Sequence, residues 1–288
     1  GKYYMYFSMK DKNDIFRLGV AMAEQPYGPF VPQDNPIKGS YSIDPCAFKD
    51  TDGSYYLYFG GIWGGQLQFY RNNKIVSPNE LPKSDETALS PKVVKMSADM
   101  LEFSEQPRDL VILDKEGKPL KHGDTEKRFF EASWMHKYGD KYYFSYSTGD
   151  THFICYGIGD NPYGPFTYQG RILNPVVGWT SHHSICEVEG EWYLFYHDVQ
   201  LSGQTHLRNV KVTELHHNPD GPAVIGFAGR HKQYWFKGLR HRIEGPAIEY
   251  LDGDYEYWKN GQRHNLQGPA KCIDGVLEYW IGGRKYAN

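Results

Sequence analysis

A pattern of strand, tight turn and strand occurs four times within the first 200 residues, and it constrains the fold more than any other feature. The clearest copy, Arg128–Thr148, reads RFFEASWMHKYGDKYYFSYST. Gly139 and Asp140 supply turn residues, and the alternating tyrosines that follow suit a half-buried strand. Related copies begin at Gly1, Ser42 and Thr180. Repetition of this kind predicts an all-β fold built from similar sheets.

A second repeated segment marks equivalent places in two of these units. Gln25–Phe30 reads QPYGPF, and Asn161–Phe166 reads NPYGPF. Antiparallel units of about four strands predict a β-propeller, in which the inner strands line a central axis. Polar residues at the starts of inner strands then converge at one end of that axis. We therefore expect Asp44, Glu131 and His182 to meet.

The alternative is that each of these polar residues has a local role. Considered alone, Asp44 could simply begin a turn, because it precedes Pro45. Considered alone, Glu131 could simply be a charged residue at the rim of the fold. Their matching positions in matching repeats favour the shared site.

The character of the chain changes after Asn218. Gly-Pro-Ala recurs at Gly221, Gly245 and Gly268, which gives a tandem repeat of roughly 23 residues. Each copy is expected to form a β-hairpin with an Asp-Gly or Asn-Gly turn. The sequence thus predicts two domains, a propeller-like domain at 1–218 and a three-copy β-hairpin repeat module at 219–288.

The repeat module loosely resembles MORN repeats, a likeness that assigns it no chemistry and no partner. His241 and His264 lie one period apart, but the third copy has Tyr286 near the corresponding place. We interpret both histidines as structural or surface residues and not as metal ligands.

Composition and charge exclude several classes of partner. The net charge of -3 gives no sign of a nucleic acid or anionic membrane partner, and the sequence has neither a bilayer-length apolar stretch nor a visible secretory signal. The cysteines lie far apart, without metal-ligand spacing, so reduced thiols and a cytoplasmic location are expected. They are Cys46, Cys155, Cys186 and Cys272.

Five ordered motifs carry a family resemblance. SIDPCAFKDTDGSYYLYFGG, RFFEASWMHKYGDKYYFSYSTGD, NPYGPFTYQGRIL, TSHHSICEVEGEWYLFYHD and LRNVKVTELHHNPDG together resemble glycoside hydrolase family 43. Members of that family are five-bladed β-propellers, typically β-xylosidases and α-L-arabinofuranosidases. The resemblance covers about Gly1 to Gly221 and implies a xylo- or arabino-oligosaccharide as substrate; the motifs favour neither sugar.

The resemblance implies inverting hydrolysis by three carboxylates, with no cofactor required. By motif match, Glu131 is the general acid and Asp44 the carboxylate that modulates its pKa. Inversion places acid and base roughly 6.5–9.5 Å apart, so that a water fits between base and sugar. The acid must stay protonated near neutral pH, which a neighbouring carboxylate and partial burial favour.

Further roles follow from the same resemblance. His182 resembles the axial histidine that helps to hold a hydrated calcium ion, and Arg208 resembles an arginine that reaches into the pocket near Asp44. Aromatic rings would stack on the apolar face of the sugar. The expected sugar contacts are Trp63, Gln66, Phe130 and Trp134.

Two departures from the family pattern stand out. The base motif, an Asp-Pro on the first blade, is expected before Gly1, and Asp11 and Asp14 lie on a turn that does not match it. The family usually has Glu-Gly-Pro at the acid, where this chain has Glu131-Ala132-Ser133. We therefore expect an N-terminally truncated propeller of about four blades, with turnover at or near zero for this chain alone.

Three interpretations are compatible with the sequence. The chain is a family 43 enzyme whose first blade lies elsewhere or comes from a partner. It is instead a non-catalytic carbohydrate-binding propeller with a repeat interaction tail. In the third interpretation, the tail hairpins replace the missing blade.

Overall fold

The computed structural model describes residues 1–71, 73–75, 81–149, 152–215, 224–225, 231–236, 239–250 and 252–286. Strands dominate these residues, and the helices among them are the short 3₁₀ turns η1 (Trp63–Gly65) and η2 (Leu67–Phe69). No helix in the described ranges is long and apolar enough to cross a membrane. The chain forms two compact units, 1–182 and 183–288.

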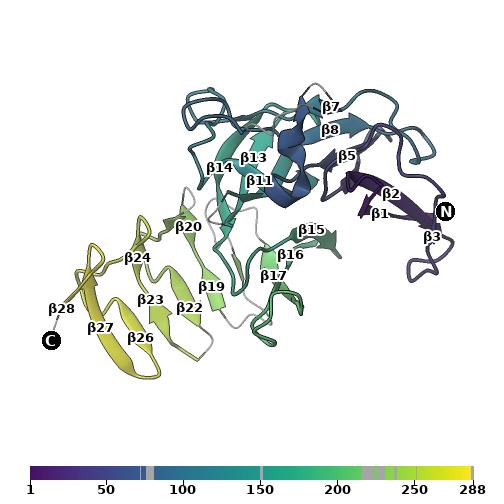
Figure 1. The fold of residues 1–288 in the computed structure, drawn as a ribbon. Helices are drawn as coiled ribbons and strands as arrows, with labels where there is room; N and C mark the ends of the chain where they lie inside the picture. The colour runs from purple at the N-terminus through teal and green to yellow at the C-terminus, as the bar shows by residue number, and fades with distance from the viewer. Residues whose placement is uncertain are drawn as a thin grey trace. The chain divides into compact units, whose positions relative to one another are not determined.

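Three sheets, antiparallel except for one strand pair, form the framework of the first unit, in the order that the repeats predicted (Figure 1). The first is β1-β2-β3, the second is β4-β5-β8-β9, and the third is β10-β14-β13-β12-β11. A small hairpin, β6–β7, stands apart from them. The strand bounds are β1 Tyr3–Lys10, β2 Phe16–Ala23, β3 Val31–Pro32, β4 Cys46–Lys49, β5 Tyr55–Phe59, β6 Tyr70–Arg71, β7 Lys74–Ile75, β8 Lys92–Lys95, β9 Arg108–Asp109, β10 Ile112–Leu113, β11 Phe129–Tyr138, β12 Lys141–Thr148, β13 Ile154–Gly159 and β14 Phe166–Leu173.

Strand β10 is the one element of the third sheet that the sequence did not predict. It pairs in parallel with β14, whereas the other pairs of this sheet are antiparallel. A two-residue strand such as β10 carries no periodic signal in the sequence.

The two QPYGPF-like segments have the same local structure, which confirms that they are equivalent. Gly28 has φ 84° and Gly164 has φ 75°, a region that favours glycine. A Cβ on Gly28 would lie 3.0 Å from the nitrogen of Phe30, and one on Gly164 would lie 2.8 Å from the ring of Phe166. The glycine therefore lets each phenylalanine fold back over the turn.

The core of the first unit is apolar and strongly aromatic. Leu57, Phe144 and Phe166 are fully buried, and the rings of Phe144 and Phe166 contact at a centroid distance of 5.7 Å. The hydroxyl of Tyr58 donates to the main-chain oxygen of Pro162 at 2.9 Å. The tyrosine-rich strands therefore supply both packing area and polar ties between sheets.

A buried polar network joins the second and third sheets. Tyr142 Oη donates to Asp50 Oδ2 at 2.6 Å, and Lys137 Nζ donates to Asp50 Oδ1 at 3.2 Å. The side chain of Asp50 is 6% exposed. Burial raises the pKa of Asp50, but the hydrogen bonds from Tyr142, Thr51 and Lys137 outweigh it, so the pKa lies below its ordinary value.

In the second unit, one sheet runs from the fourth predicted repeat into the hairpin module. Counted over the described residues it has ten strands, in the order β15-β16-β17-β18-β19-β22-β23-β26-β27-β28. Figure 1 shows the later strands side by side, towards the yellow C-terminal end. The predicted boundary at 218–219 lies outside the described residues and stays a prediction. The strand bounds are β15 His183–Val188, β16 Glu191–Asp198, β17 Asn209–Leu215, β18 Val224–Ile225, β19 His231–Gln233, β22 Ile248–Tyr250, β23 Tyr255–Glu256, β26 Lys271–Ile273, β27 Val276–Ile281 and β28 Arg284–Tyr286.

The repeat module contains more hairpins than the sequence suggested. We expected one hairpin per copy, with either an Asp-Gly or an Asn-Gly turn. The second copy uses both, because Asp252-Gly253 connects β22 to β23 and Asn260-Gly261 connects β24 (Trp258–Lys259) to β25 (Gln262–Arg263). The first copy pairs β20 (Trp235–Phe236) with β21 (Leu239–Arg240). This copy has Ala228-Gly229 in place of the Asp-Gly turn, and these two residues lie outside the described ranges.

His241 and His264 make equivalent contacts between successive copies. The Nδ1 atom of His241 accepts a hydrogen bond from the N–H of Asn260, and that of His264 accepts one from the N–H of Gly282, both at 3.1 Å. The histidines are therefore structural, as interpreted from the sequence. The four cysteines are free thiols, and the cytoplasmic location stays a prediction.

We predict that Tyr142→Phe destabilises the protein by about 2 kcal/mol, because it removes a hydrogen bond to a buried carboxylate. Tyr138→Phe, in the same β11–β12 hairpin but with a side chain 43% exposed, should change the free energy of unfolding by less than about 0.5 kcal/mol. Urea unfolding near pH 7 measures both. Equal losses in the two variants would contradict the role of the network.

Asp50 also predicts how stability depends on pH. Its pKa is lower in the folded than in the unfolded protein, so its stabilisation is fully present above the unfolded value of about 3.9 and is lost as the pH falls through the folded value. Asp50→Asn should therefore be less stable near pH 7 and should lose less stability than the wild type on acidification. Thermal unfolding between about pH 7 and pH 3 measures the two slopes, and parallel slopes would exclude this role.

Candidate functional site

The carboxylate of Asp44 is held at the start of the second repeat. Asp44 has φ 59°, in the left-handed region, which Asp adopts more readily than most residues. Its N–H donates to Ser8 Oγ at 3.2 Å, and its Oδ2 accepts from the N–H of Ala132 at 2.9 Å. Nδ1 of His182 lies 3.8 Å from Oδ1. The structure thus brings together the starts of three predicted repeats.

Glu131 lies on β11 at an irregularity of the strand. It pairs with Ser147, and the register shifts on both sides of Glu131. The next residue, Ala132, has φ 62°. Bulges of this kind re-aim side chains at the ends of strands. This is where the sequence departs from the Glu-Gly-Pro pattern, and the left-handed Ala132 turns its amide toward Asp44.

The loop that follows β5 packs closely against the Asp44 segment and Glu131. A Cβ on Gly61 would lie 2.6 Å from the Ile43 side chain and 3.5 Å from the Cβ of Glu131, and one on Gly65 would lie 2.8 Å from Ile43. The buried hydroxyl of Ser42 accepts from the N–H of Gly61 at 3.0 Å and donates to the carbonyl of Gly65 at 2.7 Å. Both glycines permit a close approach that a side chain would block.

The predicted sugar contacts differ in how they are placed. Trp63, on η1, is 51% exposed. Phe130 is only 6% exposed, so little of its ring is open to a sugar. Trp134 lies on β11, partly buried against the hydrophobic core. Of these three rings, Trp63 is the best suited to stacking.

Gln66 and Arg208 both have polar contacts within the protein. The amide of Gln66 bonds the main chain of Asp14 and Phe16. Arg208 belongs to the second unit, where its Nε donates to the carbonyl of Thr205 at 3.3 Å and its Nη1 lies 3.2 Å from His197 Nε2. The placement of Arg208 in the pocket stays a prediction.

A row of aromatic rings beside the site, Phe130, His152 and Trp179, was not predicted from the sequence. The ring of His152 contacts Phe130 at a centroid distance of 5.5 Å and Trp179 at 5.7 Å. Trp179 is 68% exposed. The row therefore leads from the residue before Glu131 to an open ring. Gly178-Trp179, directly before the Thr-Ser-His-His motif, was the available signal.

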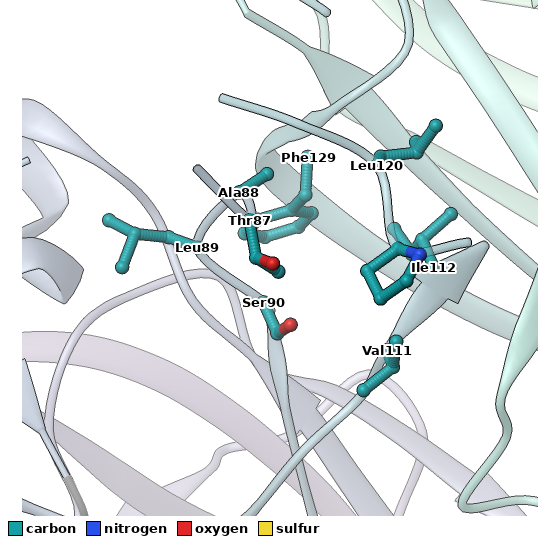
Figure 2. Close-up of a pocket in the computed structure, with 9 residues that line it drawn as sticks. Thr87, Ala88, Leu89, Ser90, Val111, Ile112, Leu120 and Phe129 are labelled. Atoms are coloured by element: carbon teal, nitrogen blue, oxygen red, sulfur yellow. The ribbon is translucent and has the colours of Figure 1, made fainter. Parts of the chain in front are cut away.

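The cavity in Figure 2 is not a sugar site. It has room for about one water, at about 10 Å³. Its lining is mostly apolar and includes Leu89, Ile112, Leu120 and Phe129. It is therefore a packing gap behind the start of β11.

The sequence implied a calcium ion held by His182 through water, which is a different case from direct ligation by side chains. In the ranges that the structure describes, no three His, Cys, Asp or Glu residues cluster as metal ligands. Calcium takes six to eight oxygen ligands, which His182 and the Asp44 carboxylate do not supply. These residues do not fit a calcium ion ligated by side chains.

Residues 1–223 match the model of glycosyl hydrolases family 43. The chain belongs to this family. The five-bladed propeller type that the family resemblance implied is confirmed, since the family's solved members share the fold of the matched region.

The relatives are named for xylosidase and arabinosidase activity. A xylosidase/arabinosidase of Bacteroides ovatus is 65% identical over 225 residues, covering 78% of this chain and 69% of the relative. The solved RS223 β-xylosidase is 66% identical with a TM-score of 0.75, covering 79% of this chain and 70% of that chain. A β-xylosidase/α-arabinofuranosidase from a compost microbial metagenome, solved with xylotriose in a calcium-free form, is 58% identical with a TM-score of 0.75, covering 80% and 71%.

We predict that Gly61→Ala destabilises the protein by about 1–3 kcal/mol, because the new methyl group meets the Ile43 side chain beside Asp44. Gly64→Ala is the matched control in the same loop, since its Cβ meets nothing within 4 Å. Its effect should stay within about 0.5 kcal/mol. Chemical denaturation measures both, and a harmless Gly61→Ala would show that the close packing is not required.

Proposed function

We propose that this protein is a glycoside hydrolase that cleaves xylosyl or arabinofuranosyl linkages in xylan-type oligosaccharides with inversion at the anomeric carbon. The observation that carries the proposal is the hydrogen bond from the Ala132 N–H to the Asp44 carboxylate. It places a fixed carboxylate beside the strand position of Glu131. The names of the relatives support the substrate class.

Glu131 acts as the general acid in this proposal. It gives its proton to the glycosidic oxygen while the bond between that oxygen and the anomeric carbon breaks. A water attacks the anomeric carbon from the opposite face and loses a proton to the base. The family resemblance expects the base in a first-blade Asp-Pro motif. The Asp-Pro within residues 1–288 is Asp44-Pro45, whose aspartate already has the modulating role, so we assign no base residue.

Asp44 acts on the acid and does not attack the sugar. Its negative charge disfavours a second carboxylate charge nearby, which keeps the acid protonated. The N–H of Ala132 binds one oxygen of the Asp44 carboxylate and His182 faces the other, so the carboxylate is held in one orientation. Arg208 keeps, as a proposal, the role of the pocket arginine that the family resemblance implies.

Trp63 is proposed as a stacking surface for the sugar, on the basis of its exposed ring and its place in the loop that packs against Glu131. Trp179, at the open end of the aromatic row, is proposed as a second such surface. The reaction needs an acid, a base and water and no organic cofactor. A hydrated calcium held through water by His182 is kept as a proposal, and no step depends on it.

Whatever turnover of xylotriose the protein shows, we predict that Glu131→Gln lowers its kcat/KM by about 10²–10⁴-fold, since the leaving sugar hydroxyl needs a proton. With 2,4-dinitrophenyl xyloside the loss should be far smaller, because that leaving group departs as a stable anion. Steady-state assays with both substrates give the ratio. Glu126→Gln is the control, because Glu126 is an exposed carboxylate paired with Arg171 in the same unit.

The same experiment decides between enzyme and binding module. The comparisons give no support for an inactive chain or for a purely carbohydrate-binding role. Equal losses on both substrates would remove Glu131 from the acid role. Xylotriose binding by calorimetry without any turnover would favour the binding module instead, and NMR of the first-formed anomer tests inversion.

A further inference from the structure

The Trp63 ring needs an anchor outside the hydrophobic core. Half of its surface is open, so packing alone holds it loosely. Its main chain is fixed instead, because the Trp63 carbonyl accepts from the N–H of Gln66 at 3.0 Å and from Nε2 of Gln68 at 2.9 Å. Trp63 and Gln66 both have left-handed backbone, with φ 58° and 64°. The orientation of the ring therefore depends on how this turn is held.

The side chain of Gln66 holds that turn to a different sheet. Its Oε1 accepts from the N–H of Phe16 at 2.9 Å, and its Nε2 donates to the carbonyl of Asp14 at 2.9 Å. Both polar ends are thus used on the connection between β1 and β2. The contacts span 50 and 52 residues of sequence and give partners to main-chain groups at the start of β2 and in the turn before it.

The receiving turn is itself well ordered. Oδ1 of Asp11 accepts from the N–H groups of Asn13 and Ile15, at 2.8 and 3.2 Å, and Oδ2 accepts from Nε of Arg17 at 3.0 Å. Arg17 also donates to the carbonyl of Ser40 at 2.8 Å. These bonds hold the β1–β2 turn in place, so the Gln66 side chain binds to a fixed segment.

We infer that Gln66 is a positioning residue that fixes the Trp63 ring for sugar binding, and not a sugar contact itself. The inference rests on the proposed function, because it gives Trp63 a sugar to bind. A direct contact would require the Gln66 amide to give up two hydrogen bonds to main-chain groups, which costs about 1 kcal/mol or more for each.

A double-mutant cycle on Gln66 and Trp63 tests the inference. The readout is the Kd for xylotriose by calorimetry, which does not depend on turnover. Gln66→Met should weaken binding about fivefold in the wild type and leave it unchanged in the Trp63→Ala background. Gln66→Glu keeps the acceptor but turns a carboxylate toward the Asp14 carbonyl, so it should weaken binding at least as much.

Controls separate this inference from the proposed function and from unfolding. Gln169→Met removes a local bond to Thr167 on β14 and should leave the Kd unchanged. Thermal unfolding checks that each variant is folded, and Gln66→Glu serves if Gln66→Met is not. An equal loss in both backgrounds, or no loss in either Gln66 variant, would overturn the inference. A wild type that binds no xylotriose would instead refute the proposed function.

Discussion

One hydrogen bond between two repeats sets the geometry of the candidate site. The Ala132 amide donates to the Asp44 carboxylate, and both residues have left-handed backbone. At Ala132 this conformation costs energy that a glycine would not pay. The strain is offset by a charge-assisted bond that joins residues 88 apart in sequence. The bulge on β11, the glycine loop above it and the His182 ring all take their places around this contact.

The repeat pattern was enough to predict the framework. Alternating aromatic residues and Gly-Asp or Asp-Gly turns located the inner and outer strands, because period and turn chemistry are local properties. Equivalence between repeats then brought Asp44, Glu131 and His182 together without any long-range information. The family resemblance added chemical roles for these residues, which the geometry alone does not assign.

Contacts between segments far apart in the chain could not be predicted from the sequence. Nothing in the sequence indicated that the β1–β2 turn would contact the amide of Gln66. Nor did the sequence show that the Phe130 ring would be 6% exposed and packed in the core. The parallel partner of β14 and the His152–Trp179 contact each depend on loops whose paths have no periodic signal.

The continuous sheet of the second unit has a consequence for how such a module changes during evolution. Each copy meets the next through main-chain donors and one imidazole acceptor, as His241 and His264 show. An in-frame duplication of one copy would therefore bring its own complementary surfaces with it. The number of copies is free to drift by gain or loss of whole repeats, while the carboxylates of the first unit keep their geometry.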